Sequence, residues 1–102
     1  MKQVFKVTYP WGKIYIAKAA CESGRYFGTP DRDIVNADFL QLPPDARKRY
    51  SVAKEILWES DTASNAEASA MEVQMILKFD SNNPKVGYNR WPKWKGEQPV
   101  GF

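Results

Sequence analysis

The chain has 102 residues, of which 43% are hydrophobic and 14% aromatic, so it is long and apolar enough to bury the core of one domain. It contains no histidine and a single cysteine, Cys21, which excludes histidine general bases, histidine-ligated metals, a disulfide within the chain and a zinc cluster. The net charge of +3 weakly favours a polyanionic partner such as nucleic acid, and no apolar run approaches the roughly 20 residues of a membrane span.

Two strands are expected at the start of the chain. Residues 3–9 are rich in Val, Phe, Thr and Tyr, and residues 13–18 alternate in the same way. Pro-Trp-Gly at 10–12 is typical of a tight turn, so the strands are predicted to pair as an antiparallel hairpin. Side chains alternate between the faces of a strand, which sets Phe5 and Tyr15 on the same side as diagonal neighbours. Because the first strand begins without the apolar core of a signal peptide, we expect a cytoplasmic protein, in a cell or an infected host.

Two helices and a third strand are expected to follow. Thr-Pro-Asp at 29–31 supplies a capping hydroxyl, a proline for the first helical position and an acid for the first turn, and the proline pair at 43–44 ends this helix. Residues 52–58 have the composition of a strand. A capping box at Ser64 opens a helix that runs to about Phe79. This order predicts an α+β fold, a small three-stranded antiparallel sheet flanked by helices.

No internal repeat or linker divides the chain, so residues 1–92 are expected to form one domain, followed by a tail at 93–102 that contains tryptophan and lysine. Two stretches combine basic and aromatic residues, Arg-Lys-Arg-Tyr at 47–50 and Arg-Trp-Pro-Lys-Trp-Lys at 90–95. Both suit contacts with a nucleic-acid backbone and stacking on bases. The alternatives are a solvated charge run in a loop for the first stretch, and tryptophans that fold back over the sheet for the second.

Glu72 is the most unusual residue of the second predicted helix. At about 100° per residue it falls inside the apolar arc of that helix, which is made by Ala68, Met71, Met75, Ile76 and Phe79. An ionised carboxylate that faces a core is costly unless it is paired or bound to a metal. Glu72 therefore either lies at the rim, reaching solvent or a basic residue, or is held at the bottom of a site for a divalent cation or a guanidinium. The sequence leaves both alternatives open.

Taken together, the motifs resemble the GIY-YIG nuclease family over roughly residues 3–92. Tyr-Ile-Ala at 15–17 falls where the family has YIG, and Arg25, ten residues after the tyrosine, falls at the spacing of its catalytic arginine. The segment that contains Glu72 resembles the glutamate helix of the family, and Gly-Tyr-Asn at 87–89 matches its closing GYN element.

The resemblance implies a metal-dependent endonuclease that hydrolyses phosphodiester bonds in DNA. It assigns Glu72 as the carboxylate that holds Mg²⁺ or Mn²⁺, and Arg25 as the residue that grips phosphate oxygens. Tyr15 would orient or deprotonate the attacking water, and Asn89 would hold the site together by hydrogen bonds. The charges of Lys13, Arg25 and the metal are expected to lower the pKa of the Tyr15 phenol.

The residues expected to contact DNA are Lys18, Arg47 and Lys48. One departure from the family concerns the first motif, where Gln-Val-Phe at 3–5 replaces GIY, so Phe5 lacks a phenol hydroxyl. We expect the rings of Phe5 and Tyr15 to point into one cleft. The missing hydroxyl also supports an alternative, a catalytically degenerate module that binds DNA or, through its tryptophan-rich tail, another protein.

Overall fold

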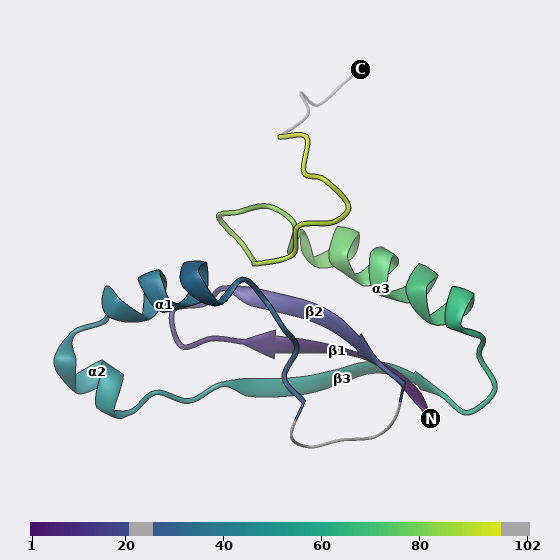
Figure 1. The fold of residues 1–102 in the computed structure, drawn as a ribbon, viewed down its shortest axis with the longest axis horizontal. Helices are drawn as coiled ribbons and strands as arrows, with labels where there is room; N and C mark the ends of the chain where they lie inside the picture. Colours follow the sequence, from purple (N-terminus) through teal and green to yellow (C-terminus); the bar gives the residue numbers. More distant parts are fainter. Residues whose placement is uncertain (21–25, 97–102) are drawn as a thin grey trace.

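The computed structural model describes residues 1–20 and 26–96, so Cys21, Arg25 and residues 97–102 lie outside the described residues. The elements along the chain are β1 (Lys2–Thr8), β2 (Ile14–Ala19), α1 (Arg32–Leu40), α2 (Pro44–Lys48), β3 (Ala53–Ser60) and α3 (Asn65–Phe79). The three strands form one antiparallel sheet in the order β2-β1-β3, with helices around it (Figure 1). The predicted α+β fold with a small three-stranded sheet is confirmed.

The β1–β2 hairpin has the predicted register. Phe5 pairs with Ala17 and Val7 pairs with Tyr15, so Phe5 and Tyr15 are diagonal neighbours on one face of the sheet. The turn closes through a hydrogen bond of 2.9 Å from the Tyr9 backbone N–H to the Lys13 carbonyl. The register of the hairpin therefore fixes the position of Tyr15 on the sheet.

The first predicted helix differs from α1 at both ends. It begins at Arg32 with Asp31 as its N-cap, because the Asp31 carboxylate accepts hydrogen bonds from two backbone N–H groups of the first turn, whereas Thr29 was the expected cap. α1 ends at Leu40, before the proline pair at 43–44 that was expected to end it, and this pair opens α2 instead, with Pro44 at its first position, where a missing N–H has no cost. Arg47, expected in a loop, therefore lies on a short helix.

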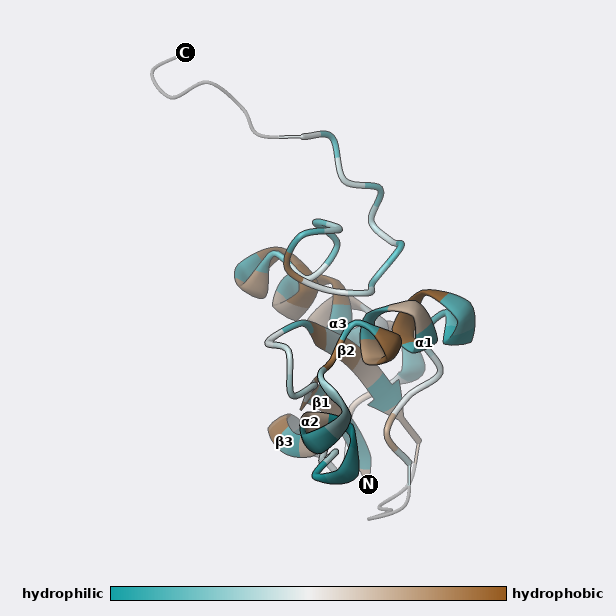
Figure 2. Ribbon diagram, turned by 90° about the vertical axis from the view of Figure 1, so that its left-hand side faces the viewer, coloured by the Kyte–Doolittle hydropathy of each residue, from teal (hydrophilic) through white to brown (hydrophobic). Residues whose placement is uncertain are grey.

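The second predicted helix, α3, is confirmed together with its capping box. The Ser64 side chain accepts a hydrogen bond from the Glu67 backbone, and the Glu67 carboxylate accepts one from the Ser64 backbone, both at 3.1 Å. The expected apolar face packs on one side of the sheet, where Ile76 joins Val4 and Ile16 in a buried cluster. Figure 2 shows apolar stretches on α1 and α3, whereas α2 is largely hydrophilic.

The free edge of β2 is covered by the segment that follows α3 (Figure 1). The backbone N–H of Ile14 donates to the Val86 carbonyl at 3.1 Å, and the Tyr88 N–H donates to the Ile14 carbonyl at 2.9 Å. Gly87 lies between them, where an added Cβ would stand 2.6 Å from the Ile14 carbonyl oxygen. Only glycine permits this close approach, so the chain is held parallel to β2 at its edge.

Candidate functional site at the edge of β2

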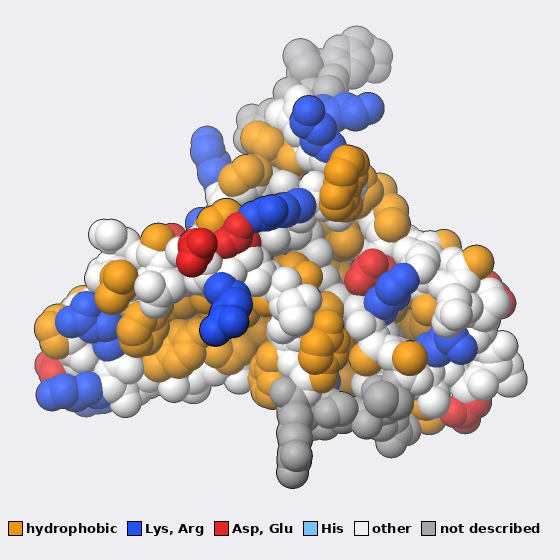
Figure 3. All heavy atoms as spheres, in the orientation of Figure 1, with side chains coloured by type: hydrophobic (Ala, Val, Ile, Leu, Met, Phe, Trp, Pro, Cys, Tyr) orange, Lys and Arg blue, Asp and Glu red, His pale blue; other side chains and the backbone are white. Residues whose placement is uncertain are grey.

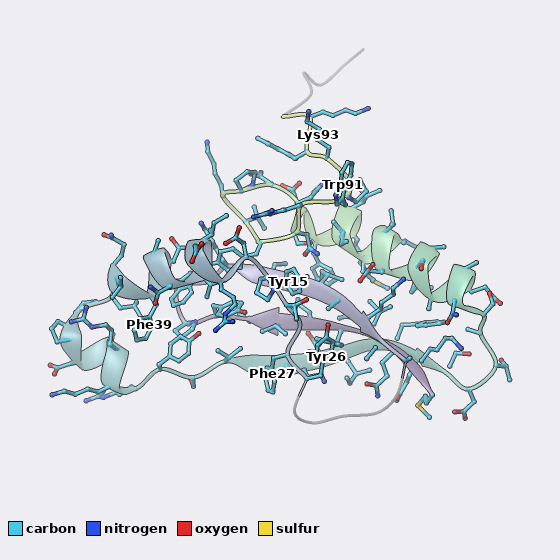
Figure 4. All side chains as sticks on the ribbon, viewed as in Figure 1. Tyr15, Tyr26, Phe27, Phe39, Trp91 and Lys93 are labelled. Atoms are coloured by element: carbon cyan, nitrogen blue, oxygen red, sulfur yellow. The ribbon has the colours of Figure 1, made fainter. Side chains whose placement is uncertain are left out.

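A pocket of about 370 Å³ opens where α3, the edge of β2 and the segment before α1 meet. Its walls are formed by Tyr15, Thr29, Pro30, Asp31, Glu72, Ile76, Tyr88, Asn89, Arg90 and Trp91. Three of the predicted catalytic residues, Tyr15, Glu72 and Asn89, therefore share one cavity although they are distant in sequence. Figure 4 shows Tyr15 on β2 and Trp91 above it, on the closing segment, as we call residues 80–96 that follow α3. Arg25 lies outside the described residues.

Tyr15 is half-buried, and its ring is packed against the backbone of Gly28. A Cβ on Gly28 would lie 2.6 Å from the ring carbon Cε2 of Tyr15 and 3.4 Å from the Cβ of Ala17, and Gly28 has a φ of 84°. The absence of a side chain at Gly28 therefore allows the segment before α1 to pack directly against Tyr15 on β2. Burial is the main cause that raises the pKa of the Tyr15 phenol, and the Tyr26 phenol and the Glu72 carboxylate raise it further.

The expectation that Lys13 acidifies Tyr15 is wrong, because the Lys13 ammonium is engaged elsewhere. Its Nζ lies 3.1 Å from Oδ2 of Asp38, and the Tyr88 hydroxyl donates to the same oxygen. The Trp11 indole N–H donates to the Tyr88 oxygen at 2.6 Å, which links the hairpin turn to the closing segment. The hydrogen bond from Tyr88, followed by that from Lys13, lowers the pKa of Asp38. This network fixes one wall of the pocket.

Glu72 is half-buried on α3 and faces the edge of β2 rather than the middle of the core. Burial raises the pKa of its carboxyl group, and the charge of Lys18 and a hydrogen bond with the Lys18 backbone oppose that shift. Backbone groups of Ile14 and Ile16 also point to this edge, so Glu72 continues the row of partners along β2. A poorly solvated carboxylate with one backbone donor that opens onto a pocket fits a hard divalent cation.

The described residues contain no group of three His, Cys, Asp or Glu side chains placed to hold a metal ion. A cation bound in this pocket would take Glu72 as a protein ligand, with water and substrate oxygens completing its coordination.

Asn89 is fixed by two hydrogen bonds to one residue of β2. Its Oδ1 accepts from the Ile16 backbone N–H and its Nδ2 donates to the Ile16 carbonyl, both at 2.8 Å. The side-chain amide thus replaces the backbone of a neighbouring strand. These two hydrogen bonds tie the segment that follows α3 to β2, while the role of Asn89 in a catalytic site stays a prediction.

Arg90 and Asp31 are pocket residues whose place in the site the sequence did not reveal. The Arg90 guanidinium pairs with Oδ2 of Asp31, while Oδ1 of the same carboxylate caps α1. Asp31 was expected only as a first-turn acid, and Arg90 only as part of the basic stretch at 90–95. The available signal was that Arg90 directly follows Asn89, so it had to lie close to the site.

Phe5 does not face the pocket, so the expectation that its ring and that of Tyr15 share a cleft is wrong. Phe5 is 0% exposed and is not among the lining residues. The ring of Tyr26 meets it edge-on at 5.6 Å between centroids, and the Lys54 ammonium lies 4.2 Å from its centroid. The rings of Phe5 and Tyr15 are on one face of the sheet, but the segment that carries Tyr26 covers Phe5, whereas Tyr15 lines the pocket.

The residues expected to contact DNA do not line the pocket. The Lys18 ammonium donates to the Ser69 hydroxyl on α3, and Nη1 of Arg47 lies 3.5 Å from the Leu40 carbonyl at the end of α1. Lys48 is on α2, which Figure 1 places at the opposite end of the molecule from α3. Figure 3 shows the basic side chains of this face in several small groups.

No family model, no curated protein and no solved structure matches this chain. Among the helices of residues 1–20 and 26–96, none has the length and apolar character needed to cross a bilayer.

Proposed function

We propose that this protein is a metal-dependent endonuclease of the GIY-YIG type that hydrolyses phosphodiester bonds in DNA. The observation that supports this proposal best is the shared pocket of Tyr15 and Glu72, with Asn89 fixed between them on the edge of β2. A phenol, a poorly solvated carboxylate and an arginine around one cavity are the side chains that metal-assisted phosphodiester hydrolysis uses.

The carboxylate of Glu72 would hold Mg²⁺ or Mn²⁺, which supplies charge neutralisation and increased acidity of water when it is bound. Burial raises the pKa of the Tyr15 phenol, which favours a role in which the protonated phenol orients the attacking water by hydrogen bonds. The Arg90 guanidinium, held at the pocket by Asp31, would contact a phosphate oxygen of the substrate. Arg25 remains a predicted phosphate contact.

Cleavage of supercoiled plasmid in Mg²⁺, in Mn²⁺ and in chelator tests the proposal. Glu72→Gln keeps the shape of the side chain but removes its charge, and we expect it to reduce cleavage by about 100-fold or more. Glu55→Gln is the matched control, because Glu55 lies on β3, pairs with Lys6 and does not line the pocket. Undiminished cutting by Glu72→Gln would overturn the assignment of the cation site.

A second candidate is a DNA-binding module that has lost turnover. The burial of Phe5 in the core favours it, because this position supplies no hydroxyl and no access to the pocket. Salt-sensitive DNA binding without metal-dependent cleavage would support this second function. Absence of both binding and cleavage would leave a protein-interaction module as the remaining alternative.

A further inference from the structure

Trp91 is the most exposed large apolar side chain of the described residues, with 75% of its surface in water, and it lines the mouth of the pocket. Figure 4 shows it above the site, on the side of the chain that carries Lys93. A single exposed apolar residue is ordinary in a soluble protein. What distinguishes Trp91 is how firmly its neighbours in the chain are held.

The residues on both sides of Trp91 are anchored to three different parts of the fold. Asn89 is bound to β2 by two hydrogen bonds, and Arg90 is paired with Asp31 at the start of α1. On the other side, the buried Asn82 donates from Nδ2 to the Pro92 carbonyl at 2.7 Å. These contacts fix the backbone around Trp91 while leaving its indole in water.

The surroundings of Trp91 favour a partner that is both flat and anionic. The exposed side chains of Lys93 and Lys95 follow it, whereas the guanidinium of Arg90, which precedes it, is paired with Asp31. A nucleobase carried on its phosphate backbone satisfies both conditions, since stacking on an aromatic ring uses any base and lysines neutralise phosphates. Bases inside a duplex are covered by their neighbours in the stack, so only an unpaired base offers a free face.

We propose that Trp91 stacks on an unpaired base of a single-stranded or locally opened DNA segment, beside the phosphate held in the pocket. The position of that phosphate rests on the proposed function, whereas the stacking itself does not. The substrate class is therefore DNA with unpaired nucleotides at the cleavage site. Lys93 and Lys95 contact the backbone on the side of Trp91 away from Asn89.

The test measures binding in chelator, so that cleavage plays no part. A 12-nucleotide single strand and the same strand in a duplex are titrated against the wild type, Trp91→Leu and the control Leu77→Ala, which changes an exposed apolar residue of α3 outside the pocket lining. Base–aromatic stacking predicts that Trp91→Leu weakens single-strand binding about 5- to 150-fold and duplex binding less than about twofold. Leu77→Ala should leave both affinities within about twofold.

An abasic site moved along the single strand gives the second measurement. At one position, loss of the base should weaken wild-type binding but not binding by Trp91→Leu, because the stacking partner is already absent. Equal affinities of wild type and Trp91→Leu for the single strand would overturn the proposal and leave the indole as a protein-docking residue. Equal losses on single strand and duplex would also overturn it. A protein that passes both measurements but never cuts DNA would overturn the proposed function alone.

Discussion

Asn89→Ala tests whether the candidate site depends on the contact between the closing segment and β2. The substitution removes both 2.8 Å hydrogen bonds to Ile16, a residue that is 0% exposed, and leaves its N–H and C=O without their partners. Each buried backbone group left unsatisfied costs about 1–3 kcal/mol. The pocket admits water beside this edge, which places the cost in the lower part of the range, so we expect a total loss of about 2–3 kcal/mol from the free energy of unfolding.

Urea unfolding monitored by circular dichroism measures this loss. A domain of this size has a free energy of unfolding of about 5–15 kcal/mol, so the midpoint should fall by roughly 1–2 M at an unchanged slope. Asn36→Ala, which changes an exposed asparagine on α1, is the control and should shift stability by less than about 0.5 kcal/mol. If Asn89→Ala lowers the free energy of unfolding by less than about 0.5 kcal/mol, the reasoning is refuted, because water would then replace the hydrogen bonds of the amide to Ile16.

Four further outcomes are expected. Glu72→Gln should raise the melting temperature at pH 7 while it reduces metal-dependent cleavage, because a poorly solvated charge is removed; a lower melting temperature would show that the attraction between Glu72 and Lys18 outweighs the cost of burial. Phe5→Tyr should reduce stability by about 1–3 kcal/mol in urea unfolding and leave cleavage no faster, because the new hydroxyl enters a closed core. Neutralising Arg47 and Lys48 together should reduce the salt slope of DNA binding by about one to two units if both touch phosphates, and an unchanged slope would make them solvated residues. Burial raises the pKa of Tyr9 from 10.0 to about 12, so the folded state holds the phenol proton more tightly than the unfolded state does. The contribution of the protonated phenol to stability is complete below pH 10 and is lost as the pH rises towards about 12. Absorbance of ionised tyrosine and circular dichroism, recorded together, can follow this loss.

The sheet and the long helix could be predicted because their signals are local. The turn at 10–12 and the alternation on either side of it fix the hairpin register, which places Tyr15 correctly. The capping box at Ser64 fixes the start of α3, and from there the helical period places Ile76 on the buried face and Glu72 beside it.

The features that the sequence did not predict depend either on two residues that could occupy the same structural position or on contacts between residues far apart in the sequence. Asp31 replaces Thr29 as the cap of α1, because either side chain suits an N-cap and only the path of the chain decides between them. The burial of Phe5 depends on Tyr26, which reaches it from a separate segment. The engagement of Lys13 with Asp38 depends on how α1 docks, and no local pattern contains that information.

The row of contacts along β2 explains how a carboxylate comes to lie in an apolar arc of α3. An edge strand exposes backbone groups that need hydrogen-bond partners. In β2 the backbone of Ile14 bonds to the backbone of 86–88, the backbone of Ile16 to the side chain of Asn89, and the backbone of Lys18 to Glu72. The same contacts that close the edge therefore bring the candidate site together. Asn89 serves the edge through two neutral hydrogen bonds, so its loss should lower both stability and activity. Glu72 bonds to the same edge through a charged carboxylate that burial disfavours, so neutralising Glu72 should raise stability while it lowers activity. If substitution lowers stability at Asn89 and raises it at Glu72, then Asn89 has a structural role in the pocket, whereas Glu72 is kept there for its chemistry.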